Sequence, residues 1–145
     1  MAERWRRLLP GLWAGLLLCI AGLAAPAVFA ALPSADAGQV VSRIFVREAW
    51  LSLGLAAVLL VLERRQVPHP GPGNVPLLWA TVACTLLGYF VVQALMPAAR
   101  LRQGALSFGQ LHLISTVFYA IKTLAVLLLA WRATGAASVN RPPSS

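Results

Sequence analysis

The sequence predicts an all-α protein: a four-helix transmembrane bundle whose helices run alternately up and down. Three observations predict this class. Four long apolar runs fill a chain of 145 residues, 59% of its residues are hydrophobic against 11% charged, and its mean hydropathy is +0.77. A soluble bundle needs a polar face on each helix, and these runs have none. Strands that alternate apolar and polar residues are missing too, which argues against a transmembrane barrel.

The four runs cover about residues 8–32, 40–62, 76–96 and 108–131. A helix rises about 1.5 Å per residue, so about 20 apolar residues cross a hydrocarbon core of about 30 Å. Each run reaches or approaches that length, and we therefore expect residues 1–132 to form one four-span domain. The remaining segment, 133–145, is rich in Ala, Ser and Pro, and it is expected to be a disordered cytoplasmic tail.

The first run carries small residues on one face. Gly11, Gly15 and Gly22 follow a spacing that lets a neighbouring helix approach closely. Pro26 has no backbone N–H and predicts a kink near the outer end of this helix. Arginines precede the run, but its apolar stretch exceeds the roughly 7–15 residues of a signal-peptide core. We therefore expect a retained span rather than a cleaved leader.

The connections between the runs are short. Residues 33–38 are expected to form a tight turn, so that the first two helices are antiparallel neighbours. The second helix must then begin near Val40 and include Arg43, Arg47 and Glu48 in order to span. Proline and glycine make residues 63–73 an irregular loop, and Pro97 is expected to end the third helix.

Charge predicts the orientation. With four spans, both termini lie on one side, and placing that side in the cytoplasm puts seven arginines inside and four outside. We therefore expect cytoplasmic termini. The bias toward Arg and Ala suggests a GC-rich bacterium, so a chain with these spans is expected in the bacterial inner membrane. The net charge of +8 is concentrated at helix ends, where it meets anionic headgroups. The expected partners are the lipid bilayer and other membrane proteins or further copies of the chain, but no nucleic acid.

Polar side chains inside apolar runs are costly in lipid, so each is a functional candidate. Phe108, His112, Ser115, Tyr119 and Lys122 are spaced by four, three, four and three residues. That spacing places them on one stripe of the fourth helix, which is expected to face the interior of the bundle.

Depth along the helices links this stripe to Glu48. At 1.5 Å per residue, Glu48 lies about 12 Å from the outer end of its helix, and His112 lies about 6 Å from the outer end of the fourth. A carboxylate and an imidazole at similar depth can pair, as an outer-leaflet proton-accepting site or as a clasp that fixes helix register. Lys122 is expected to reach toward cytoplasmic headgroups. The candidate polar cluster consists of Arg43, Arg47, Glu48, His112, Ser115 and Tyr119.

No catalytic motif is present: the sequence has no HExxH, GxSxG, P-loop or glycine-rich dinucleotide fingerprint. We therefore expect no enzyme. Two histidines, one of them in a loop, exclude a haem held by paired histidines, and no cofactor is expected. Cys19, Cys84, Met96 and His112 would suit Cu(I) by ligand type, but their spacing forms no motif, so no metal ligand is assigned.

Several short patterns resemble those of the bacterial domain-of-unknown-function family 4149. They are Trp13-x-Gly15, Ala25-Pro26-x-x-Phe29, Ala37-Gly38, Phe45 with Glu48, and Phe108-x-x-Leu111-His112-x-x-Ser115. The last is the most specific, although Gln110, Leu113 and Tyr119 depart from the family pattern. The resemblance extends over about residues 5–131.

The resemblance implies a four-helix integral membrane protein without an assigned reaction. The family is similar to the eukaryotic transmembrane protein 205 group, whose members are associated with platinum-drug resistance. The Leu-His pair also resembles that of copper-resistance membrane proteins of the CopD type. Two functions follow: a non-enzymatic structural or accessory membrane component, which we favour, and a small transport or metal-handling protein that uses the outer polar cluster.

Overall fold

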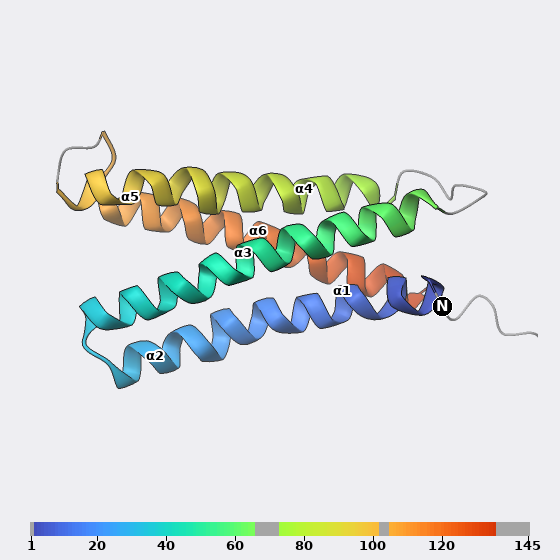
Figure 1. The fold of residues 1–145 in the computed structure, drawn as a ribbon, viewed down its shortest axis with the longest axis horizontal. Helices are drawn as coiled ribbons and strands as arrows, with labels where there is room; N and C mark the ends of the chain where they lie inside the picture. The colour runs from blue at the N-terminus through green and yellow to red at the C-terminus, as the bar shows by residue number, and fades with distance from the viewer. Residues whose placement is uncertain (1, 66–72, 102–104, 136–145) are drawn as a thin grey trace, which may run out of the picture.

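The computed structural model describes residues 2–65, 73–101 and 105–135. These residues are almost entirely helical, and four continuous helical segments are long and apolar enough to cross a membrane. The all-α, four-span class is therefore confirmed. In Figure 1 the segments alternate in direction, so the N-terminus and the end of the last helix lie at the same end of the molecule. We call this the terminal end, and the opposite one the loop end.

The first span consists of α1 (Ala2–Cys19), a π-helical segment η1 (Ile20–Ala24) and α2 (Ala25–Ala31). Pro26 is the second residue of α2 and lies two positions after the end of the π-helical segment. A proline cannot donate to the preceding turn, and a wider turn accommodates its ring. The structure places a π-helical segment beside Pro26 within an unbroken span, and the kink expected there stays a prediction.

The second span, α3 (Ser34–Arg64), begins six residues earlier than expected. Ala37 donates its backbone N–H to the Pro33 carbonyl at 2.9 Å, which starts the helix. Asp36 lies in the first turn, where a carboxylate interacts favourably with the helix dipole. The tight turn expected over residues 33–38 is therefore wrong, because most of that segment is already helical.

The third span consists of α4 (Val75–Thr85), a second π-helical segment η2 (Leu86–Val91) and α5 (Val92–Arg100). Pro97 lies inside α5 and does not end it, contrary to expectation. As in the first span, a π-helical segment precedes the proline. The two spans that carry these segments are the first helices of two successive helical hairpins.

The fourth span, α6 (Phe108–Gly135), begins with reciprocal capping. The backbone N–H of Ser107 donates to Gln110 Oε1 at 2.9 Å, and the backbone N–H of Gln110 donates to Ser107 Oγ at 3.3 Å. The helix continues four residues beyond the expected end. Residues 133–135 of the expected tail are thus helical, and 136–145 lie outside the described residues.

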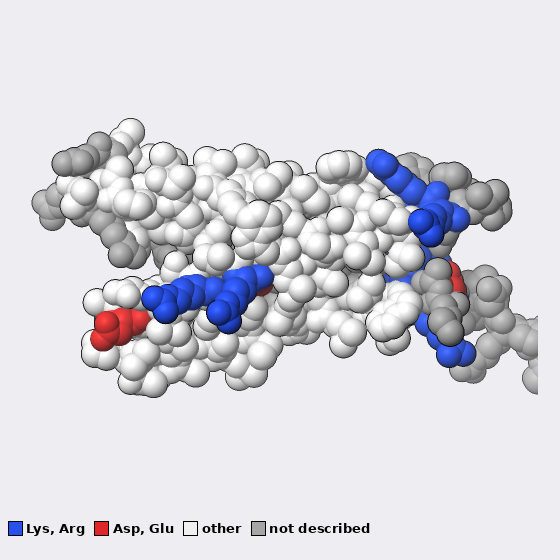
Figure 2. Space-filling view, in the orientation of Figure 1, with Lys and Arg blue, Asp and Glu red and all other residues white. Residues whose placement is uncertain are grey.

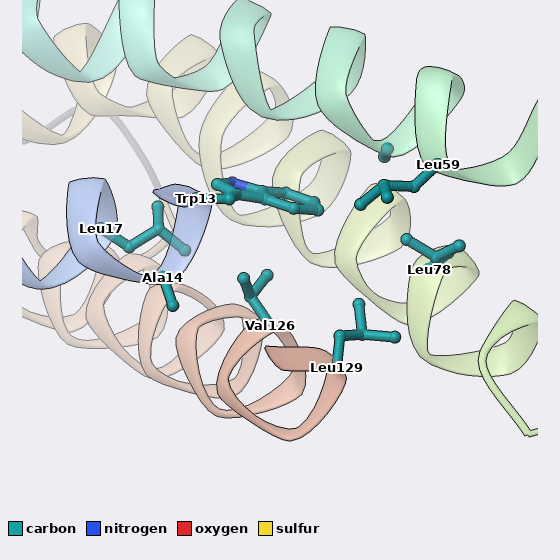
Figure 3. Close-up of a cluster of buried hydrophobic side chains, with 8 residues drawn as sticks. Trp13, Ala14, Leu17, Leu59, Leu78, Val126 and Leu129 are labelled. Atoms are coloured by element: carbon teal, nitrogen blue, oxygen red, sulfur yellow. The ribbon is translucent and has the colours of Figure 1, made fainter. Parts of the chain in front are cut away.

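Packing differs between the two ends. The main core joins all four spans near the terminal end and contains Trp13, Leu17, Leu59, Leu78, Val126 and Leu129 (Figure 3). A smaller cluster of Val92, Met96, Ala99 and Leu111 joins only α5 and α6. No residue of α2 is buried. The hairpins therefore pack tightly at the terminal end and diverge toward the loop end (Figure 1).

Candidate functional site

A buried ion pair lies between α3 and α6. Lys122 Nζ donates to Glu48 Oε1 at 2.7 Å and to Oε2 at 2.9 Å, and each residue is only 3% exposed. Glu48 is fourteen positions after Ser34 and Lys122 is fourteen positions after Phe108, so both lie near the middle of their helices. In a bilayer this is the region where an isolated charge costs most, and pairing removes much of that cost.

Two further side chains extend the pair into a network. Ser52 Oγ donates to Glu48 Oε1 at 2.5 Å, and Trp13 Nε1 donates to Ser52 Oγ at 3.0 Å. The indole of Trp13 lies inside the core in Figure 3. One connected polar network therefore joins α1, α3 and α6.

Tyr119 borders the ion pair on the loop-end side. Its hydroxyl donates to the backbone carbonyl of Leu17 at 2.9 Å, and its ring meets Phe45 edge-to-face at 5.3 Å between centroids. Lys122 Nζ lies 4.8 Å from the centroid of the same ring, within the range of a cation–π interaction. Tyr119 thus positions the lysine as well as joining α6 to α1.

The expected pairing of Glu48 with His112 is wrong. His112 is exposed, and its ring stacks on Phe108 at 6.2 Å with an interplanar angle of 16°. Because α3 begins at Ser34, Glu48 lies about 21 Å from the loop end of its helix, whereas His112 lies about 6 Å from the loop end of α6. The residue at the matching depth is Lys122. The expectation that Lys122 reaches toward cytoplasmic headgroups is therefore wrong, because its ammonium group is paired with Glu48.

Arg43 and Arg47 are not part of the polar network. Both are exposed, and neither forms an ion pair with any described residue. Figure 2 shows a basic patch over α3, separate from the basic side chains gathered at the terminal end. Arg43 and Arg47 are the residues of α3 that account for this patch. The expectation that Arg43 and Arg47 belong to the polar cluster is therefore wrong. They lie on the same helix as Glu48 but on a different face of it.

The expected packing role of Gly11, Gly15 and Gly22 is also wrong within the chain. All three are exposed, and a Cβ added to any of them would meet nothing within 4 Å. The close approach occurs instead at Gly88 in η2, where a Cβ would lie 2.4 Å from Cβ of Phe118. Ser115 Oγ donates to the Gly88 carbonyl at 3.0 Å across the same contact. Nothing in the sequence distinguished Gly88 from the other glycines of the apolar runs.

A cavity of about 590 Å³ lies between the diverging hairpins. The α6 stripe of Phe108, His112, Ser115, Tyr119 and Lys122 lines one wall, so the expected stripe does face the interior. The α3 wall is formed by residues at matching depths, among them Gly38, Val41, Phe45 and Glu48. Other lining residues come from the first and third spans, including Ala25, Phe29, Cys84, Thr85 and Gln93.

Potential metal-binding side chains do not cluster in the described part of the chain. Among the described residues no group of three or more His, Cys, Asp and Glu side chains is placed to hold one. Cys19 and Cys84 are both free thiols, the first exposed and the second half-buried on the cavity wall. His69 lies outside the described residues.

Four apolar spans around a buried ion pair define a multi-pass helical membrane protein. The chain belongs to the family described as Domain of unknown function (DUF4149), whose match covers residues 8–105. This confirms the expected family, although the match ends before Phe108 and so includes Glu48 but not Lys122 or the Phe-x-x-Leu-His-x-x-Ser pattern. No curated protein and no solved structure matches the chain.

Proposed function

We propose that the chain is a non-enzymatic accessory component of the bacterial inner membrane, in which the polar network holds the bundle together. One observation carries the proposal: the charged groups at the centre of the bundle are occupied by one another and by neighbouring side chains. Lys122 donates to both oxygens of Glu48, and Ser52 adds a third hydrogen bond to the carboxylate. A general base or a nucleophile must be free to react with substrate. A structural clasp between helices instead needs every one of its polar groups to be hydrogen-bonded, as these are.

The distribution of charge supports an orientation with both termini in the cytoplasm. Arginines gather at the terminal end, where the described residues include Arg4, Arg6, Arg7, Arg64, Arg65 and Arg132. An excess of basic residues is typical of the cytoplasmic side of a bacterial inner-membrane protein. One ion pair among the described residues at this end also joins two spans, because Arg6 Nη1 of α1 lies 3.6 Å from Glu63 Oε1 of α3.

The metal-handling alternative has no supporting observation in the described residues. His112, its central residue, stacks on Phe108 and lies away from Glu48, Cys19 is exposed, and no group of metal-binding side chains forms. We therefore do not propose it.

A double replacement of the ion pair tests the accessory role. Glu48→Met together with Lys122→Met removes both charges and retains apolar bulk, which is often nearly neutral for stability. A deletion strain is complemented with the wild-type chain or with this double variant. Assemblies are then compared by native electrophoresis and cross-linking of membranes solubilised in mild detergent.

We expect the double variant to complement fully and to retain the same cross-linked membrane partners. A folded double variant that fails to complement while keeping those partners would mean that the pair acts on a substrate. A chain that runs without any partner in native membranes would also contradict the accessory role. Binding of about one soft metal ion per chain, lost in His112→Asn, would restore the alternative.

A further inference from the structure

The cavity between the hairpins extends from the loop end to the centre of the bundle. Its lining on α6 begins at Phe108 and ends at Lys122, and its lining on α3 runs from Gly38 to Glu48. From the level of His112 to that of Lys122 the distance is about 15 Å at the helical rise per residue. A volume of about 590 Å³ lies within the range of about 300–1,000 Å³ that small-molecule sites occupy.

The two long walls of this cavity differ in chemistry. The wall from the first hairpin is mainly apolar and includes Ala25, Phe29, Val41 and Phe45. The wall from the second hairpin carries most of the polar side chains, including His112, Ser115 and Thr116 of α6 and Gln93 of α5, beside apolar residues such as Met96. An occupant therefore meets mainly carbon on the first hairpin, and most of the hydrogen-bonding groups lie on the second.

Some of these polar groups are available to an occupant. Ser115 and Thr116 donate to the backbone carbonyls of Gly88 and His112, but the side chains of Gln93 and His112 form no hydrogen bond with the described part of the chain. A primary amide and an imidazole both donate and accept, so they match hydroxyl or carbonyl groups. A plain hydrocarbon chain would leave them unpaired, which is costly away from water.

The charges on the cavity lining restrict the class of ligand further. The only described acidic and lysine side chains on the lining are Glu48 and Lys122, and they neutralise one another. A charged ligand would need an unpaired counter-charge. The described lining provides none, since Arg43 and Arg47 do not line the cavity. Bringing an uncompensated charge into such a site is unfavourable.

We propose that this cavity is a binding site for a neutral amphiphile. Its apolar body lies against α2 and α3, and its hydroxyl or carbonyl groups hydrogen-bond with Gln93 and His112. The Glu48–Lys122 pair forms the inner limit of the site. This inference goes beyond the accessory role and does not depend on it, because binding is measured on the purified chain alone.

Photo-labelling in a bilayer tests the proposal. The purified full chain is reconstituted in phosphatidylcholine nanodiscs with 1-decanoylglycerol that bears a diazirine near the end of its acyl chain. Labelled peptides are mapped by mass spectrometry. Unlabelled 1-decanoylglycerol, decanoate and decyltrimethylammonium, which are neutral, anionic and cationic with similar chain lengths, are the competitors.

Two glycines of α3 provide a matched pair of variants. Gly38 lines the cavity and Gly54 does not, and an added Cβ meets nothing within 4 Å at either position. Gly38→Leu is expected to fill part of the cavity and reduce labelling at least about fivefold, whereas Gly54→Leu leaves it unchanged. Gln93→Leu retains the bulk but removes the hydrogen-bonding amide, and it should weaken competition by unlabelled 1-decanoylglycerol about tenfold, the scale of one lost buried hydrogen bond.

The expected labels lie on residues of the cavity wall, and the neutral competitor displaces the probe better than either charged one. Labels spread over exposed residues outside the cavity, such as Leu12 and Leu23, and unchanged by Gly38→Leu, would mean ordinary lipid contact and would overturn the proposal. Equal competition by decanoate would overturn the neutral class. If Gly38→Leu fails to fold, the Gln93→Leu result and the competitor order decide the question.

Discussion

Glu48 and Lys122 lie at the same depth because each is fourteen positions after the first residue of its helix. The helices α3 and α6 run in the same direction from the loop end (Figure 1), so equal offsets bring the two residues to one level, where their side chains pair. Phe45 and Tyr119 repeat the relationship at eleven positions, where their rings meet edge-to-face. The shared register explains why a carboxylate finds an ammonium at the centre of an otherwise apolar bundle.

Breaking the pair on one side should destabilise the bundle strongly. Glu48→Gln leaves Lys122 buried without a counter-charge, and Lys122→Met does the same to Glu48, so each is expected to cost about 3–5 kcal/mol. The double variant Glu48→Met, Lys122→Met should lie within about 1–2 kcal/mol of wild type, because no buried charge remains. Reversible unfolding in mixed micelles measures all three, and the coupling follows from the cycle.

His112→Asn is the control for that cycle. Since His112 is exposed and its ring stacks on Phe108, its replacement should change stability by less than about 0.5 kcal/mol and add independently to Glu48→Gln. Strong coupling between His112 and Glu48, with none between Lys122 and Glu48, would contradict the pairing described above.

Gly88 and Gly15 should respond in opposite ways to alanine. At Gly88 the new Cβ would meet Cβ of Phe118, close to the α6 backbone, so the helices must separate. We expect Gly88→Ala to cost about 1–3 kcal/mol, as overpacking does in other tightly packed sites.

Gly15→Ala meets nothing within 4 Å and should be neutral or stabilising by up to about 1 kcal/mol, because alanine favours the helix. Gly15→Leu, which the small-residue face would have predicted to be disruptive, should also melt near wild type. Thermal denaturation in detergent measures these variants. A loss of stability in Gly15→Leu equal to that in Gly88→Ala would mean that α1 has a close neighbour, such as a second copy of the chain.

The four spans can be predicted from the sequence because span length and apolarity depend only on the residues of each segment. The sequence was not sufficient for the start of α3, since Ser34–Gln39 has no apolar run, although its residues extend the helix readily. A helix that begins six residues later places Glu48 nearer the loop end, at about the depth of His112 rather than that of Lys122. Lys122 was missed for a related reason: a lysine in a span is compatible with either a buried partner or a headgroup, and only the register of two helices decides.

The cavity could be predicted only in part. The spacing of Phe108, His112, Ser115, Tyr119 and Lys122 placed one wall toward the interior. The divergence of the hairpins, which creates the space, depends on where the core packs. Trp13, Leu78 and Val126 fill the terminal end, and α2 buries no residue at the other. No local pattern encodes this difference, just as none marks Gly88 as the close contact.

Tyr119→Phe should separate the hydroxyl of this residue from its ring. The variant loses the hydrogen bond to the Leu17 carbonyl, which we expect to cost about 1 kcal/mol, but it retains the edge-to-face contact with Phe45. Tyr119→Leu loses both and should cost about 1 kcal/mol more, together with the cation–π contact of Lys122. Unfolding free energies of the two variants provide the comparison. Equal losses would mean that the ring contributes nothing.

Orientation in the membrane can be tested with paired reporters. Basic side chains gather at the terminal end, and the positive-inside bias then predicts that this end is cytoplasmic. A fluorescent-protein fusion after Gly135 should therefore be fluorescent, and alkaline phosphatase at the same position should be inactive. Alkaline phosphatase inserted after Leu101, between α5 and α6, should be active because the predicted orientation places that connection outside. A phosphatase that is active after Gly135 but inactive after Leu101 would reverse the orientation, and activity at both positions would contradict four spans.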